Sequence, residues 1–123
     1  MRLVSGDTAK GVYKNDGPFD VYINLNKIQE LQITSLVNGA VLGANVKITD
    51  AINFLETTGD EVYVGVANHM KKIASWGIRN QGSLAGNLMM KNAHNEFPSD
   101  VFLSLETAGA IANITLVSRM KGR

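Results

Sequence analysis

Residues 31–59 read LQITSLVNGAVLGANVKITDAINFLETTG, and a change of hydrophobic period within them decides the fold class. The first part has apolar side chains on both sides of Asn38-Gly39. Asparagine and glycine tolerate positive φ, which a type I′ turn requires at both of its central positions. The pattern therefore predicts a β-hairpin, with one arm from Leu31 to Val37 and the other from Val41 to Val46.

The second part of this stretch, and the sequence after it, has the spacing of amphipathic helices. Thr49 is expected to be the N-cap of a helix that Gly59 ends. A second helix is expected from about Asp60 to Ile73, with Trp76 closing the helix end onto the core. Residues 98–109 begin with Pro-Ser-Asp and end with glycine, and they predict a third helix.

Strands are expected on either side of these helices. Residues 3–5, 21–25 and 111–117 are short apolar or alternating runs. Residues 77–92 have no clear period and are expected to be an irregular loop. This order of elements predicts an α+β fold, with a mixed or antiparallel sheet and helices packed on it, in one domain.

The composition excludes several classes of protein. The chain of 123 residues has a formal net charge of +1 and no cysteine. The charge gives no reason to expect nucleic acid or an anionic membrane as a partner. The lack of cysteine excludes disulfides, thiolate zinc sites and iron–sulphur ligation within this segment. No secretion signal and no run of about 18 apolar residues is present, so we expect a cytoplasmic protein.

The first segment that points to a binding site is Gly6–Gly11, which directly follows a strand. Glycine lets the backbone approach an anion closely, and successive N–H groups in such a turn form an anion site. Thr8 adds a hydroxyl group and Lys10 adds positive charge. The segment lacks the Lys-Ser/Thr pair of a phosphate-binding P-loop. A plain surface turn is the alternative interpretation.

The second segment is Gly82–Asn87, which places small residues, a hydroxyl and an amide within one tight stretch. Its backbone N–H groups are candidates for holding a phosphate or the edge of a sugar. The alternative is a connection in which small residues simply permit close packing.

Neither histidine belongs to a recognisable catalytic set. His69 is expected to be solvated or interfacial. His94-Asn95-Glu96 has the H-x-E order of zinc deaminases, but the C-x-x-C that must accompany it is impossible without cysteine. We expect no catalytic residue and no metal ligand in this chain.

The two glycine segments together resemble the FAD-binding domain of the aldehyde oxidase and xanthine dehydrogenase family of molybdenum hydroxylases. Leu3–Thr8 is similar to the LVxGNT loop of that domain, and Ile78–Leu88 is similar to its VRNxxSxGGNL segment. Phe97–Asp100, followed by Ala108–Ala110, extends the similarity over essentially the whole chain. The resemblance is closer to the aldehyde oxidases of insects and plants than to xanthine dehydrogenases.

The resemblance implies a PCMH-type FAD-binding domain with the fold shared by vanillyl-alcohol oxidase. It places the first loop near the pyrophosphate and flavin, and it completes the site with positions from the second half of the chain. The FAD-binding residues that it implies are Leu3, Val4, Ser5, Gly6, Asp7, Thr8, Ala9, Lys10, Ile73, Ser83, Gly86, Asn87 and Asp100.

The resemblance also implies a role in electron transfer. FAD in this family takes electrons from 2Fe-2S clusters and passes them to oxygen or NAD, while an aldehyde or purine is oxidised at a molybdenum cofactor in another domain. The implied partners are FAD, the iron–sulphur and molybdenum domains, and a second subunit in a homodimer. Two other interpretations stay open, a non-catalytic remnant that keeps the fold without flavin and an unrelated α+β module that binds anions.

Two substitutions and the extent of the chain depart from the family pattern. Asp7 replaces the usual asparagine, and a carboxylate within about 4–6 Å of a diphosphate is repelled or driven toward protonation. We therefore expect weaker FAD binding unless this side chain turns away. Ala85 replaces a glycine, which tests whether the backbone there needs positive φ. The family domain has a preceding subdomain and a continuation, so residues 1–123 are expected to be a partial FAD-binding domain without activity of its own.

Overall fold

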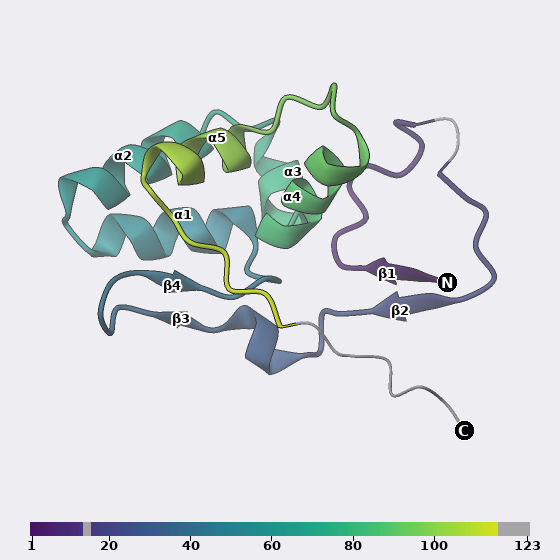
Figure 1. The fold of residues 1–123 in the computed structure, drawn as a ribbon, viewed down its shortest axis with the longest axis horizontal. Coiled ribbons are helices and arrows are strands. Elements are labelled where there is room, and N and C mark those ends of the chain that lie inside the picture. The colour runs from purple at the N-terminus through teal and green to yellow at the C-terminus, as the bar shows by residue number, and fades with distance from the viewer. Residues whose placement is uncertain (14–15, 116–123) are drawn as a thin grey trace.

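The computed structural model describes residues 1–13 and 16–115 (Figure 1). Within these residues it contains both helices and short strands, which confirms the α+β class. In chain order the elements are β1 (Arg2–Val4), β2 (Tyr22–Asn24), the 3-10 helix η1 (Gln29–Gln32), β3 (Thr34–Ser35), β4 (Val41–Leu42), α1 (Ile48–Thr57), α2 (Glu61–Met70), α3 (Trp76–Gln81), α4 (Leu84–Ala93) and α5 (Asp100–Thr107).

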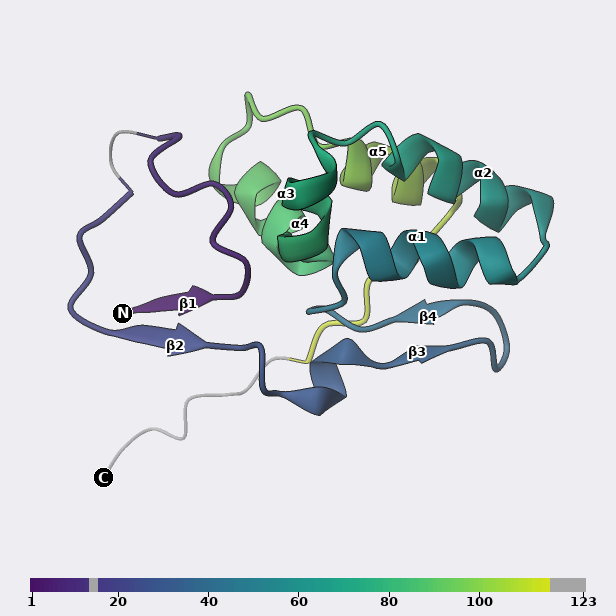
Figure 2. The same ribbon diagram turned by 180° about the vertical axis from the view of Figure 1, so that it is seen from behind.

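The elements divide into a helical end and a strand end, which Figures 1 and 2 show from opposite sides. At the helical end α2 packs against both α1 and α5, and the β3–β4 hairpin lies along α1. The pair β1–β2 lies at the other end, and α3 and α4 lie between the two groups. The chain leaves β1 through a long loop that passes next to α3 and α4 before it returns to β2.

The strands of the described residues form two separate sheets of two strands, instead of one larger sheet. β1 pairs with β2 in parallel, and β3 pairs with β4 antiparallel in the register Thr34↔Leu42. The predicted hairpin is therefore confirmed. Its turn has positive φ at Asn38 (58°) and at Gly39 (107°), as the sequence required.

The hydrophobic core lies between the hairpin and α1, α2, α4 and α5. Ile48, Met70 and Val101 are the largest side chains that are almost completely buried. Each contributes about 1.5–3 kcal/mol by leaving water. The remaining buried members are smaller or slightly more exposed and comprise Val46, Ala51, Ile52, Leu55, Val66, Ala67, Ile73 and Leu84.

Two of the three predicted helices begin where their caps indicated. The side chain of Asp60 accepts hydrogen bonds from the N–H groups of Val62 and Tyr63 at the start of α2, and Ser99 accepts one from Phe102 at the start of α5. Gly109 follows α5 with a φ of 69°, the left-handed conformation expected after a helix.

The start of α1 differs from the prediction. Lys47, and not Thr49, is the N-cap residue, and it makes no side-chain capping bond. The Thr49 hydroxyl instead donates to the side-chain oxygen of Asn80 on α3. Thr49 is therefore used to hold two helices together, and the backbone next to Lys47 pairs with residues 82–84.

The predicted irregular loop at residues 77–92 is wrong, because this region holds α3 and most of α4. Serine caps both helices: Ser75 accepts from the N–H of Ile78, and Ser83 accepts from the N–H of Gly86. α3 has only 6 residues, too few to show a hydrophobic period. α4 has small residues in its first turns, so its buried face has little hydrophobic signal.

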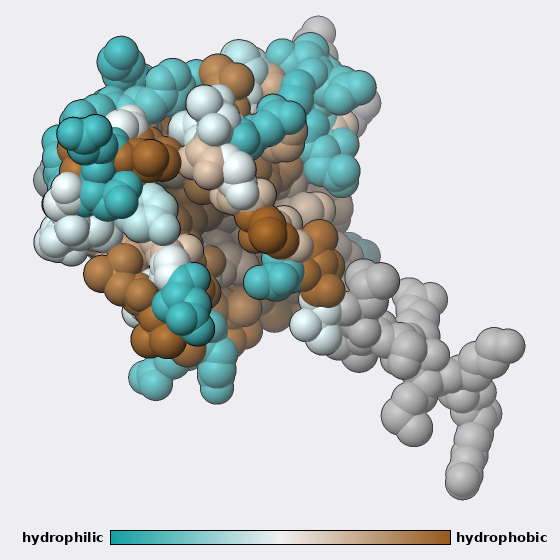
Figure 3. Space-filling view, turned by 60° about the vertical axis from the view of Figure 1, so that its left-hand side comes forward, coloured by the Kyte–Doolittle hydropathy of each residue, from teal (hydrophilic) through white to brown (hydrophobic). Residues whose placement is uncertain are grey.

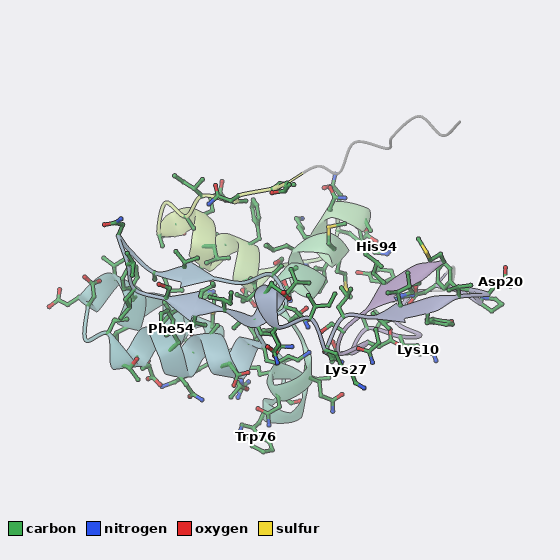
Figure 4. All side chains as sticks on the ribbon, turned by 90° about the horizontal axis from the view of Figure 1, so that it is seen from below. Lys10, Asp20, Lys27, Phe54, Trp76 and His94 are labelled. Carbon is green, nitrogen blue, oxygen red and sulfur yellow. The ribbon has the colours of Figure 1, made fainter. Side chains whose placement is uncertain are left out.

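Two smaller predictions also fail. Residues 111–115 lie in no strand, and the rest of the predicted strand at 111–117 lies outside the described residues. Trp76 does not close onto the core, since it is 71% exposed and points away from the molecule (Figure 4). Ile73 alone has the buried position that was expected for both.

Several hydrophobic side chains of the described residues are exposed. Figure 3 shows them in brown on the face where the ends of the hairpin and of α1 and α2 come forward. In the hairpin they include Leu36, Val37 and Val41, and on α2 and α5 they include Val62 and Leu103. Within the described residues, no helix is long and apolar enough to cross a membrane.

Candidate functional site

A cavity of about 380 Å³ lies between the loop after β1 and the segment that joins α3 to α4. Its volume is within the range of about 300–1,000 Å³ that is common for sites of small molecules and cofactors. Both glycine segments therefore contribute to one hollow, although they are far apart in the sequence. The residues that line it are Arg2, Ser5, Gly6, Asp7, Thr8, Ala9, Val12, Ile48, Ile73, Ala74, Ile78, Gly82, Ser83, Gly86, Asn87, Met90, Phe97, Pro98 and Asp100.

Most of the residues that the sequence predicted as FAD-binding lie in this lining, and three do not. Leu3 and Val4 belong to β1, where backbone pairing with β2 fixes them away from the cavity. Lys10 belongs to the loop, but it is exposed and does not line the cavity. The predicted residues that do line the cavity are Ser5, Gly6, Asp7, Thr8, Ala9, Ile73, Ser83, Gly86, Asn87 and Asp100.

Close packing at Gly6 joins the two walls of the cavity. A methyl group placed on Gly6 would lie 2.0 Å from the carbonyl oxygen of Gln81, the last residue of α3. Real side chains never approach backbone so closely, so this position requires glycine. Gly82 is less constrained: a methyl group there would lie 3.1 Å from the carbonyl oxygen of Ile78 and at an ordinary contact distance of 3.6 Å from the Thr8 hydroxyl oxygen.

The loop after β1 offers a row of unused backbone donors. Among the described residues, no acceptor is paired with the N–H groups of Gly6, Asp7, Thr8 and Ala9. Asp7 has a φ of 50°, in the left-handed region, so the backbone changes direction in the middle of this row. Unpaired N–H groups that line a concave turn are suited to bind an anion.

The second glycine segment, Gly82–Asn87, offers fewer backbone donors than predicted: among the described residues, only the N–H of Ser83 in this segment has no paired acceptor. The N–H of Leu84 donates to Val46 and that of Ala85 donates to Ala44. Gly86 donates to the Ser83 side chain, and Asn87 donates to the Ser83 carbonyl. The first turn of α4 is thus already satisfied by protein.

Side chains provide the free polar groups of α4. The side-chain oxygen of Asn87 accepts from the hydroxyl of Ser99, which leaves its NH₂ group as a donor. Ser83 accepts a hydrogen bond at its hydroxyl and keeps its own proton to donate. Ala85 stands in α4 without positive φ, so this backbone has no need of the family's glycine.

The charged side chains that line the cavity are Arg2, Asp7 and Asp100. Arg2 pairs with Asp7 at 3.5 Å and with Asp16, and its guanidinium lies 5.4 Å from the centre of the Phe19 ring. Asp100 lies 3.4 Å from a ring nitrogen of His69. Asp7 therefore turns toward a cation of the protein, which weakens the repulsion that its charge exerts on an anion.

An aromatic contact lies beside the cavity. The rings of Tyr13 and His94 stack with 3.5 Å between their centres and 3° between their planes. Tyr13 follows the cavity residue Val12, and His94 precedes Phe97 and lies at the end of α4. This contact fastens the far end of the loop to α4.

The cavity also contains residues that the sequence did not reveal. Arg2 lies in a strand, and Val12 and Met90 are apolar residues without a distinctive spacing. Phe97 and Pro98 carried a signal, because they belong to the matched Phe97–Asp100 segment. Within residues 1–13 and 16–115, no group of three or more histidine, aspartate or glutamate side chains is arranged to hold a metal ion.

Comparison with known proteins matches residues 1–122 to the family model described as the FAD binding domain in molybdopterin dehydrogenase. The abscisic-aldehyde oxidase of Arabidopsis thaliana is 42% identical over 104 residues, which cover 82% of this chain and 8% of that protein. The probable aldehyde oxidase 1 of Oryza sativa subsp. japonica is 36% identical over 96% of this chain. An indole-3-acetaldehyde oxidase of Zea mays is 34% identical over 97%. The chain spans 9% of the length of each of these two relatives.

Proposed function

This chain belongs to the family of FAD-binding domains of molybdopterin dehydrogenases, and we propose that the cavity between its β1 loop and α4 holds FAD for electron transfer. FAD is the cofactor of this family. When bound, it accepts electrons from one centre and passes them to another. The observation that carries the proposal is that Gly6–Ala9 line one cavity together with Ser83, Gly86 and Asn87.

The residues of the cavity fit this cofactor. The free N–H groups of Gly6, Asp7, Thr8 and Ala9 would hold the diphosphate. The side chains of Thr8, Ser83 and Asn87 would add donors, while Asp100 would accept a hydrogen bond from a hydroxyl group. Apolar lining would exclude water from the flavin ring and comes from Val12, Ile48, Ile73, Ile78, Met90 and Phe97.

The wider role follows from the relatives, whose names describe them as aldehyde oxidases. We propose that this segment relays electrons from iron–sulphur clusters through FAD to oxygen or NAD during aldehyde oxidation. Its partners would be the iron–sulphur and molybdenum domains of such an enzyme, in a cytoplasmic homodimer. This chain contributes flavin binding, and we assign it no catalytic residue.

A titration of the 123-residue chain with FAD tests the flavin site. Saturable quenching of flavin fluorescence is expected, with a shift of the flavin absorption bands. Thr8→Val should weaken binding several-fold, because it removes a cavity hydroxyl at almost constant volume. Thr57→Val is the matched control, since the Thr57 hydroxyl donates to Phe54 on α1 and does not line the cavity.

Two results would favour the other interpretations. A chain that shows helical circular dichroism and unfolds cooperatively, yet takes up no FAD, would be a remnant that keeps the fold without flavin. A chain that binds inorganic pyrophosphate and not FAD would be a general anion-binding module.

A further inference from the structure

Lys47 connects the two walls of the cavity through its backbone and its side chain, although it does not line the cavity. Its backbone lies opposite Ser83 in an isolated antiparallel bridge. On either side of this bridge, the N–H of Ile48 donates to Gly82 and the N–H of Leu84 donates to Val46, each at 3.0 Å. The main chain of Lys47 is therefore fixed to the start of α4.

The side chain of Lys47 reaches the other wall. Its ammonium group donates to the hydroxyl of Ser5 at 2.7 Å and to the side-chain oxygen of Asn26 at 2.9 Å. The amide of Asn26 in turn donates to the carbonyl of Ser5 at 3.0 Å. Ser5 is thus held at its hydroxyl and at its carbonyl, immediately before the free N–H groups of Gly6–Ala9.

The Lys47 ammonium group also contributes positive charge near the cavity. Arg2 is the cation among the described lining residues, and Asp7 and Asp16 already neutralise it. Lys10 is exposed outside the cavity. Lys47 places a positive charge behind Ser5, at the base of the loop that would meet the diphosphate. Asp50 is the carboxylate that acts on Lys47 by charge.

Stability alone does not explain a lysine at this position. Burial lowers the pKa of the Lys47 ammonium group, and Asp50 raises it by a smaller amount. The folded protein therefore carries a cost for keeping this group charged, which an apolar side chain of similar length would avoid. The hydrogen bonds from the ammonium group to Ser5 and Asn26 point to a role in the orientation of the loop.

We propose that Lys47 is a positioning residue for FAD binding, which ties Ser5 to the start of α4 and aims the N–H groups of Gly6–Ala9 into the cavity. That the ligand is FAD rests on the proposed function. That Lys47 holds Ser5 in place rests on its hydrogen bonds alone and does not require FAD.

Two variants of Lys47 and a charge-matched control test the binding effect. Lys47→Met should raise the dissociation constant of FAD about 10-fold, as expected for the loss of hydrogen bonds from a charged group. Lys47→Arg should restore most of the affinity, because a guanidinium group also donates to two acceptors. Lys27→Met removes the same charge from an exposed position and should leave the affinity unchanged.

A double-mutant cycle separates positioning from a general loss of stability. If Lys47 acts through Ser5, the affinities of Lys47→Met, Ser5→Ala and the double variant will be non-additive. The melting temperature without FAD should change little in Lys47→Met. Equal FAD affinity in Lys47→Met and the wild type would overturn the proposal, as would a Lys47→Arg variant as weak as Lys47→Met.

Hydrogen exchange measured without FAD tests the tie between Lys47 and Ser5 even if the chain does not bind flavin. Lys47→Met should speed amide exchange in residues 5–9 and leave exchange in α2 unchanged. Unchanged exchange in residues 5–9 would overturn the positioning role. A wild-type chain that binds no FAD, combined with faster exchange in the variant, would sink the flavin function and retain the tie between Lys47 and Ser5.

Discussion

At the scale of single residues, the site depends on contacts that the sequence indicated only in part. The glycine at position 6 was expected to let the backbone approach an anion, and it also lets the loop touch the end of α3 at Gln81. Lys47 had no motif to mark it, because its role comes from Ser5 and Ser83, which are distant in sequence. Contacts between distant segments have no local period, so the sequence could not predict them.

Asp7 gives the first prediction at this scale. Asp7→Asn should tighten FAD binding by about 1 kcal/mol, because it removes a negative charge next to the proposed diphosphate site. Asparagine accepts the left-handed conformation that Asp7 has at a φ of 50°. The partly exposed pair with Arg2 that is lost contributes only about 1 kcal/mol. A calorimetric titration that finds no gain in affinity would contradict this prediction.

Gly6→Ala should have the opposite effect. The new methyl group would lie 2.0 Å from the Gln81 carbonyl oxygen, so the loop must move away from α3. We expect at least a 10-fold loss of FAD affinity and a loss of about 1–3 kcal/mol in the free energy of unfolding. Gly65→Ala is the control, because a methyl group there meets nothing within 4 Å. The same affinity in Gly6→Ala as in the wild type would refute the close contact.

The lowered pKa of Lys47 predicts a dependence of stability on pH. The unfolded chain keeps this proton up to about 10.5, while the folded protein releases it at lower pH. Between these two values the unfolded state binds more protons, so the free energy of unfolding rises with pH. Below the folded-state pKa the full cost of the buried charge is present. Urea unfolding can be measured for the wild type and for Lys47→Met from about pH 8 upward. The free energy of unfolding of the wild type should rise relative to that of Lys47→Met as the pH increases. A constant difference would contradict the assigned cause.

At the scale of secondary structure, the elements with a strong period could be predicted and the short ones could not. The hairpin, α2 and α5 followed from the Asn38-Gly39 turn, the Asp60 cap and the Ser99 cap. α3 was missed because its 6 residues are too few to show a helical period, and α4 because small residues occupy its first turn, although Ser75 and Ser83 stand at the expected cap positions. Cap residues were thus the better guide where helices are short.

The two serine caps allow a matched pair of variants. Ser75→Ala and Ser83→Ala each remove a side-chain acceptor from a helix start, and each should cost about 1 kcal/mol of stability. Ser83 lines the cavity and Ser75 does not. Both variants should lower the free energy of unfolding, but only Ser83→Ala should also weaken FAD binding. Equal FAD affinities for the two variants would show that Ser83 acts only as a cap.

At the scale of the whole molecule, the core and the candidate site overlap only in part, since Ile48 and Ile73 belong to both. The buried cluster lies among the hairpin, α1, α2, α4 and α5, while one wall of the cavity comes from the loop that joins β1 to β2 in the other sheet. A sheet of two strands has little stability by itself in water. The α+β class could be predicted from the order of elements. The division into two sheets could not, because the local sequence of a strand does not indicate which other strand it pairs with.

This division predicts uneven protection of the backbone. Amides of β1 and β2 should exchange faster than those of α1 and α2 in the absence of ligand. Addition of FAD should slow exchange in residues 5–9 and in α4, and leave the hairpin β3–β4 almost unchanged. Hydrogen exchange measured by mass spectrometry checks both statements. Uniform protection of strands and helices would contradict the first statement.

The two walls that meet at Gly6 also set an order of events during synthesis. A ribosome completes the loop of residues 5–9 before the opposing wall, which is complete only after residue 100 has been added. A nascent chain therefore has one wall of the cavity without the other while the residues between them are synthesised. Capture of the flavin must wait until almost the whole segment is made, so uptake of the nucleotide would report that both distant parts have come together.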